Sequence, residues 1–152
     1  MRSTVLAASM ALAVACGSSP SAPSPGPPVG PRTGAWIGSL TDPANGQGVV
    51  RMDLLETSLG GNGLLAGTWT ATFGDPSQNS SGEVSGGVTG SAVQLILRPA
   101  VPVTCPNPGP VPVVYGSYFA FNLSLAGATI AGPYNYQGCS STVSGTLTIT
   151  RQ

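Results

Sequence analysis

The chain contains few side chains that could carry acid, base or nucleophilic chemistry. Its 152 residues include no histidine, and the five basic residues are all arginine. The five acidic residues are Asp42, Asp53, Glu56, Asp75 and Glu83. They are scattered rather than paired, and no serine lies in a nucleophile-elbow sequence. We therefore expect a protein that is not an enzyme and that needs no cofactor.

The acidic residues also give little support to a metal site. Asp42-Pro43 and Asp75-Pro76 are expected to open loops, because Asp-Pro sequences initiate turns. A calcium ion shared by these two loops is the weaker alternative. Asp53 and Glu56 are expected on the outward face of a strand or at its end. A chain without histidine and with three cysteines predicts no metal site.

Cys16 follows a short export signal. Arg2 supplies a positive charge, and residues 5–15 (VLAASMALAVA) form an apolar run too short to cross a bilayer as a helix. Ala13-Val14-Ala15-Cys16 resembles the lipobox of bacterial lipoproteins. The resemblance implies cleavage before a diacylated Cys16 and anchoring of an exported protein in the bacterial cell envelope. Ordinary signal-peptide cleavage after Ala15 is the alternative.

The region after the cysteine predicts a tether rather than a folded domain. Residues 17–33 are rich in proline, serine and glycine and nearly uncharged, so they cannot bury a core. We expect a signal peptide at 1–15, the lipidated cysteine with a disordered tether at 16–33, and one domain at 34–152. Gly17 favours the outer membrane, where the organism has one, with the domain in the periplasm or on the cell surface.

The domain itself is expected to be all-β. Eight runs alternate apolar and polar residues, and no stretch shows helical periodicity. The runs are 34–41, 49–57, 64–73, 82–89, 92–98, 117–125, 129–136 and 142–151. Five of them contain the unit apolar-x-Gly-x-apolar, of which Leu65-x-Gly67-x-Trp69 is an example. A glycine on the apolar face permits tight coiling and leaves room for a bulky neighbour.

These strands predict an eight-stranded antiparallel up-and-down barrel, because closure removes both open edges of the sheet. A two-sheet β-sandwich is the alternative. In a meander, the loops at 42–48, 74–81, 99–116 and 137–141 share one end. The short loops lie at the other end with both termini, so the long loops should point away from the membrane.

The two remaining cysteines fall in long loops at the same predicted end. Cys105 lies in the loop 99–116 and Cys139 in the loop 137–141. An exported protein occupies an oxidising compartment, where such a pair forms a disulfide. By the chain-entropy estimate, a Cys105–Cys139 disulfide would stabilise the folded protein by roughly 3–4 kcal/mol, because it closes a loop in the unfolded chain. It would hold the proline-rich loop over the mouth of the barrel.

The apolar face predicts a mouth that could bind a ligand. Phe73, Phe119 and Tyr136 are expected near the long-loop end, with Trp69 and Tyr134 deeper. The other positions expected near this mouth are Leu40, Val50, Val84, Leu97 and Val143, and Phe121 is expected deeper in the barrel. An uncharged aromatic mouth suits a small apolar ligand. The alternative is that these side chains simply fill a small barrel.

Gly34-Ala35-Trp36 resembles the G-x-W of lipocalins and related calycin barrels. In those barrels the tryptophan closes one end beneath an arginine of the last strand, and Arg151 ends the last predicted strand here. The resemblance implies a closed barrel with Trp36 and Arg151 at the tether end. Some small barrels of this size inhibit proteases, which is a further functional alternative by analogy.

Three functions are thus open: a non-enzymatic binding module for a small apolar ligand or a protein surface, a structural component of the cell envelope, and a protease inhibitor. The expected partners are the membrane, through the acyl chains, and the bound ligand or protein. Nucleic acid is not an expected partner, since the net charge is zero and only 7% of residues are charged.

Overall fold

The computed structural model describes residues 30–43, 46–59, 62–101, 103–105, 113–115, 118–137 and 142–152. Nearly all of them belong to β-strands. The strands are β1 (Gly34–Asp42), β2 (Gly46–Leu59), β3 (Asn62–Phe73), β4 (Ser80–Thr89), β5 (Ala92–Pro99), β6 (Val103–Cys105), β7 (Val113–Tyr115), β8 (Tyr118–Ala126), β9 (Thr129–Gln137) and β10 (Thr142–Arg151). One short 3-10 helix, η1 (Pro76–Gln78), lies between β3 and β4.

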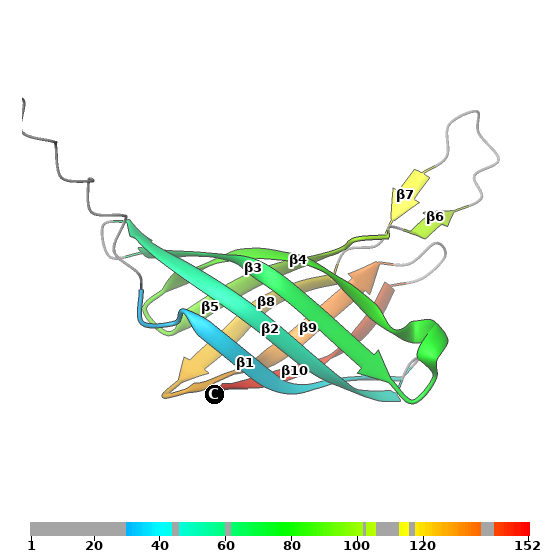
Figure 1. Cartoon of the computed structure of the whole chain (residues 1–152), viewed down its shortest axis with the longest axis horizontal. Helices are drawn as coiled ribbons and strands as arrows, with labels where there is room; N and C mark the ends of the chain where they lie inside the picture. Colours follow the sequence, from blue (N-terminus) through cyan, green and yellow to red (C-terminus); the bar gives the residue numbers. More distant parts are fainter. Residues whose placement is uncertain are drawn as a thin grey trace, which may run out of the picture.

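Eight of these strands form a closed antiparallel barrel. Their order around the barrel is β1-β10-β9-β8-β5-β4-β3-β2, and β1 closes the ring by pairing with β10 (Figure 1). Apart from the inserted β6–β7 hairpin, strands adjacent in sequence are adjacent in the barrel. The predicted up-and-down barrel is confirmed, and the described strands do not form two separate stacked sheets.

The glycine of the repeated unit sits where two strands approach too closely for any side chain. A Cβ at Gly67 would lie 2.0 Å from the Asp53 carbonyl oxygen on β2. A Cβ at Gly86 would lie 2.0 Å from the Gln94 carbonyl oxygen on β5. Glycine at these points lets the strands bend and coil tightly enough to close a narrow barrel. At Gly67 the space is taken by the neighbouring backbone and not, as predicted, by a bulky side chain.

The interior of the barrel is filled with apolar side chains. The largest fully buried ones are Trp36, Trp69, Tyr134, Leu40, Met52, Leu95, Leu97, Leu123, Ile130, Leu147 and Ile149. An eight-stranded barrel is just wide enough for such side chains to fill it. On β10 the outward positions carry hydroxyls, since Thr146, Thr148 and Thr150 are exposed. Burial of this interior face is the driving force for closure.

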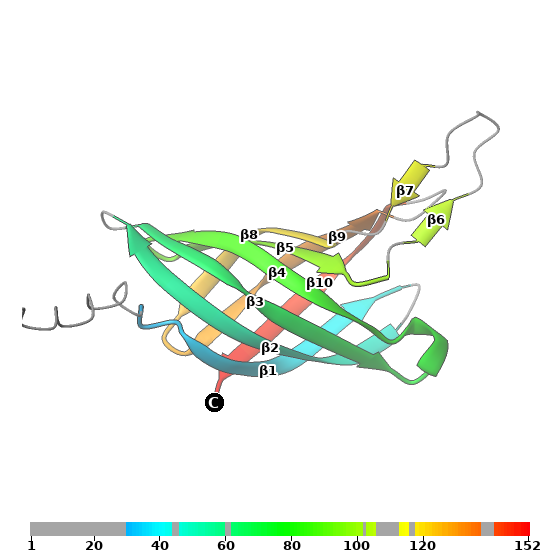
Figure 2. The same cartoon turned by 45° about the horizontal axis from the view of Figure 1, so that its top comes forward.

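The connections differ in length between the two ends of the barrel. Figures 1 and 2 show η1 and the β6–β7 hairpin at one end, while the described chain begins toward the other end, where Gln152 also lies. The β1–β2 connection is shorter than predicted, since pairing continues to Asp42 and Gly46. The β6–β7 hairpin was not predicted, because its three-residue strands lie in a proline-rich stretch. Among the described residues, no helix is long and apolar enough to span a membrane.

Strand β8 carries an irregularity that the alternating pattern does not reveal. The β8–β9 register shifts between Phe119 and Ser124, and Asn122 has a positive φ of 61°. Tyr118 and Ala120 are buried before this point, and Leu123 is buried after it. The bulge therefore changes which residues of the strand face inward.

Candidate functional site

A cleft opens at the long-loop end of the barrel. We call it the mouth cleft, and its volume is about 700 Å³. The lining residues come from β3, the β3–β4 connection with η1, β4, the end of β5, β8, β9 and β10. They are Thr70, Ala71, Thr72, Ser77, Gln78, Asn79, Ser80, Ser81, Pro99, Ala100, Val101, Tyr118, Tyr136 and Val143. A space of this size is typical of a small-molecule site.

Aromatic rings form one wall of the mouth cleft. The ring centroids of Tyr118 and Tyr136 are 4.5 Å apart, with the planes tilted by 32°. Trp69 packs edge-on against Tyr118 with 5.3 Å between centroids, and Tyr134 lies 5.9 Å from Tyr118. The Trp69 indole N–H donates to the Arg98 carbonyl at 3.4 Å, which fixes the ring. Tyr136 is half-buried, so part of its ring faces the cleft.

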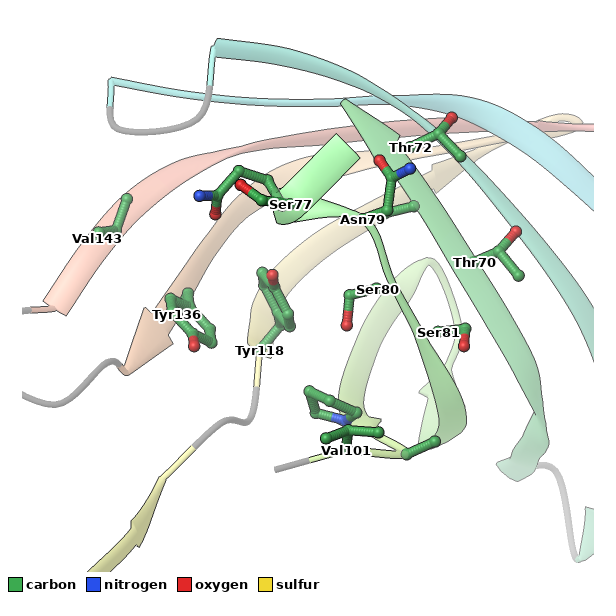
Figure 3. A pocket seen from close by; sticks show the side chains of 14 residues that line it. Thr70, Thr72, Ser77, Asn79, Ser80, Ser81, Val101, Tyr118, Tyr136 and Val143 are labelled. Atoms are coloured by element: carbon green, nitrogen blue, oxygen red, sulfur yellow. The ribbon is translucent and has the colours of Figure 1, made fainter. Parts of the chain in front are cut away.

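Hydroxyl and amide groups form the opposite rim. Figure 3 shows Tyr118 and Tyr136 next to each other, with Ser77 and Asn79 above them. The Asn79 Oδ1 accepts a hydrogen bond from the Phe73 N–H at 2.8 Å, so the end of β3 holds this side chain. Within the part of the chain that the structure describes, the tyrosines are the only ionisable residues that line the cleft. The cleft thus combines an aromatic wall with an uncharged polar rim.

Asp75 shapes this rim without taking part in it. It caps η1, and its carboxylate accepts from the Ser77 N–H at 2.9 Å. Hydrogen bonds from the Ser77 N–H and hydroxyl lower the pKa of Asp75 from its ordinary value of 3.8. The predicted turn role of Asp75-Pro76 is confirmed. Among the described residues, no group of three histidine, cysteine, aspartate or glutamate side chains could hold a metal ion.

The structure brings together only some of the residues predicted at the mouth. Tyr136 and Val143 line the cleft, while Trp69 and Tyr134 lie behind Tyr118 in the wall. Phe73 is buried in the space left by Gly48, whose Cβ would lie 2.6 Å from the ring, and it does not line the cleft.

One lining residue of β8 was not predicted from the sequence. Tyr118 was missed, because the prediction placed Phe119 and Phe121 inward and could not foresee the bulge at Asn122. The side chains of Phe119 and Phe121 lie outside the described residues.

The chain was also compared with known proteins. A scan against protein-family models, a search of curated proteins and a search of solved structures found no match.

The opposite end of the barrel contains an ion pair between Glu56 and Arg32 that was not predicted from the sequence. Glu56 was expected to face outward or to lie at a strand end, but it is 1% exposed on the inward face of β2. Its Oε1 lies 2.6 Å from Arg32 Nη1, and its Oε2 accepts from the Arg32 N–H at 2.7 Å. Gly30 and Gly63 flank the carboxylate, since a Cβ at either position would overlap it.

Residues 30–33, here named the closing turn, hold this end of the barrel. The prediction assigned them to the tether, but the turn packs against three strands. The Gly30 N–H donates to the carbonyl of Glu56, a residue of β2, at 2.9 Å. The indole of Trp36, a residue of β1, donates to the Arg32 carbonyl at 3.0 Å. The Arg151 guanidinium of β10 donates to the Pro31 carbonyl. The folded unit thus includes residues 30–33, which the prediction had placed before it.

The expected barrel-closing pair lies at this same end. Trp36 and Arg151 are backbone partners in the β1–β10 register, and Trp36 is 1% exposed. Arg151 is exposed and contacts the closing turn through Pro31. Both residues therefore contribute to the attachment of the closing turn.

The structure describes none of the three cysteine side chains. Cys16 and Cys139 lie outside the described residues. Cys105 ends β6, of which only the backbone is described. The β9–β10 connection that contains Cys139 joins the strands at the long-loop end, as does the insertion that contains β6.

Proposed function

We propose that the protein is an exported, envelope-anchored lipoprotein whose barrel acts as a non-enzymatic binding module. The mouth cleft is the observation that carries this proposal. It opens at the end of the barrel opposite the closing turn, where the chain arrives from its N-terminal segment. A ligand or a protein surface would therefore meet the cleft on the side away from the membrane. The pairing of Trp36 with Arg151 supports the proposed likeness to calycin barrels.

Anchoring through Cys16 is tested by fractionation. The Cys16→Ala protein is expected in the soluble fraction of the envelope, while the wild type stays with the membranes, because several acyl chains are needed for stable attachment. Globomycin should produce the same release as the substitution. Identical membrane fractions for wild type and Cys16→Ala would contradict the anchor.

A Cys105–Cys139 disulfide is part of the proposal. The barrel topology supports it, since both cysteines belong to connections at the long-loop end. Peptide mapping of the protein without reduction is expected to find one peptide pair joined by these residues. Two free thiols in protein isolated from the envelope would exclude the bond.

Binding at the mouth cleft is tested by photo-crosslinking in living cells. Benzoylphenylalanine in place of Ser80, which lines the cleft, is expected to form a discrete adduct. The same group in place of Thr148, on the outer wall, should not. A Val143→Trp substitution should suppress the adduct at position 80 because the indole would occupy the mouth. The matched substitution Ser144→Trp, on the outward face of β10, should leave it unchanged.

Equal labelling at positions 80 and 148 would contradict the binding site. A complete lack of adducts would favour the second candidate, a structural component of the envelope without a dedicated ligand. The observation in favour of that candidate is the packed interior below the cleft, where Met52, Leu95 and Ile149 are fully buried.

A further inference from the structure

The chemistry of the mouth cleft restricts the ligand further, on the assumption that the proposed binding function holds. Among the described residues that line the cleft, only the tyrosines are ionisable. An ionic ligand entering the cleft would lose hydration without gaining an opposite charge, which is unfavourable. The ligand that fits is therefore electrically neutral.

The rim adds a second restriction. Ser77, Gln78, Asn79, Ser80 and Ser81 carry hydroxyl and amide groups, which both donate and accept hydrogen bonds. A wholly apolar ligand would cover these groups and leave them without partners, at a cost in binding free energy. The rim therefore favours a ligand with several donors and acceptors along its edge.

The aromatic wall adds a third restriction. Tyr136 lines the cleft and is half-buried beside Tyr118, so part of its ring surface faces the cleft next to the polar rim (Figure 3). A partner for this surface needs an apolar face of its own. A pyranose ring has both properties, since its axial C–H bonds form an apolar face and its equatorial hydroxyls form a polar edge.

We infer that the mouth cleft binds a neutral oligosaccharide, with one sugar ring stacked on Tyr136 and its hydroxyls bonded to the rim from Ser77 to Ser81. The cleft volume of about 700 Å³ and its open side leave space for more than one sugar ring. The sequence predicted a small apolar ligand. The ligand inferred here is apolar only on the faces of its sugar rings.

The test uses the full-length protein in phosphatidylcholine vesicles and isothermal titration calorimetry. The probes are cellohexaose, maltohexaose and chitohexaose, with hexagalacturonate as the acidic counterpart and N-phenylnaphthylamine as the apolar one. At least one neutral hexasaccharide is expected to bind, and hexagalacturonate is not. Tyr136→Ala should weaken binding about tenfold by removing the stacking surface, while Tyr136→Phe should change it by less than about threefold.

Gln78→Ala provides a second variant that does not disturb the core, because Gln78 is exposed in η1. It should weaken saccharide binding several-fold with an unchanged melting temperature. Ser144→Ala on the outer wall is the matched control and should have no effect. Hexasaccharide binding that survives both Tyr136→Ala and Gln78→Ala would overturn the assignment to this cleft.

The remaining outcomes separate this inference from the proposed function. Binding of N-phenylnaphthylamine alone, abolished by Val143→Trp, would overturn the saccharide and leave a binding module. A crosslink at position 80 that Val143→Trp suppresses, without saccharide binding, would also overturn the saccharide and leave a binding module. The absence of crosslinks and of binding by every probe would overturn both.

Discussion

Replacing Gly86 with alanine is expected to lower the free energy of unfolding by about 2–3 kcal/mol. The added Cβ would lie 2.0 Å from the Gln94 carbonyl oxygen, and 3.1 Å from the Leu95 Cα. Both atoms belong to the backbone of β5, so relief requires a shift of the strand and not of a flexible side chain. Native proteins are stable by only about 5–15 kcal/mol, so this loss is large. Equilibrium denaturation in urea measures it.

Gly87, the next residue of β4, provides the matched control. A Cβ there meets only the Gly63 carbonyl oxygen at 3.5 Å, which is an ordinary contact. Gly87→Ala should leave stability unchanged or raise it by up to about 1 kcal/mol, because glycine is unfavourable inside a strand. Equal losses for the two variants would show that the tight strand contact at Gly86 is not what requires glycine.

The second large effect is expected at Glu56. Breaking a buried ion pair by removing one partner costs about 3–5 kcal/mol. The Arg32 side chain keeps 24% of its surface exposed, so its lone charge would be partly hydrated. We therefore expect Glu56→Gln to lower the free energy of unfolding by about 2–3 kcal/mol. Urea denaturation of the purified variant is again the measurement.

Asp53→Asn is the control for Glu56→Gln, since Asp53 lies on the same strand in an exposed ion pair with Arg51 at 3.3 Å. Such pairs contribute about 0–1 kcal/mol. A double-mutant cycle of Glu56→Gln with Arg32→Gln should give a coupling of about 1–3 kcal/mol. Coupling near zero would mean that Glu56 acts through its hydrogen bond to the Arg32 N–H and its packing against Gly30 and Gly63 alone.

The barrel could be predicted because its local signals agree with one another. Alternation along β3 places Leu65, Trp69 and Ala71 inward, and all three are buried. The glycine between the inward residues marks strand contacts that the structure shows at Gly67 and Gly86. Short turns between antiparallel runs then leave the meander as the simplest arrangement.

The features that could not be predicted depend on contacts between distant residues, which the alternation of apolar and polar residues does not reveal. Position 56 follows the inward series Val50, Met52 and Leu54, but a carboxylate there is acceptable only because Arg32 reaches it. Arg32 itself lies in a proline-rich stretch that looks like tether. Tyr118 was missed for a similar reason, since the bulge at Asn122 depends on pairing with β9 and reverses the facing of the strand. The mouth cleft could therefore not be predicted, because its lining depends on the inward facing of Tyr118 and on the position of η1.

The closing turn also determines how the barrel would bear a mechanical load. It is bonded to β2 through Glu56, to β1 through Trp36 and to β10 through Arg151. The seam between β1 and β10 is where a pull on the N-terminal segment would otherwise peel the first strand from the last. With the closing turn attached on both sides of that seam, tension is shared among three strands. A tethered barrel built in this way could be dragged by its N-terminal segment without its seam being the first part to open.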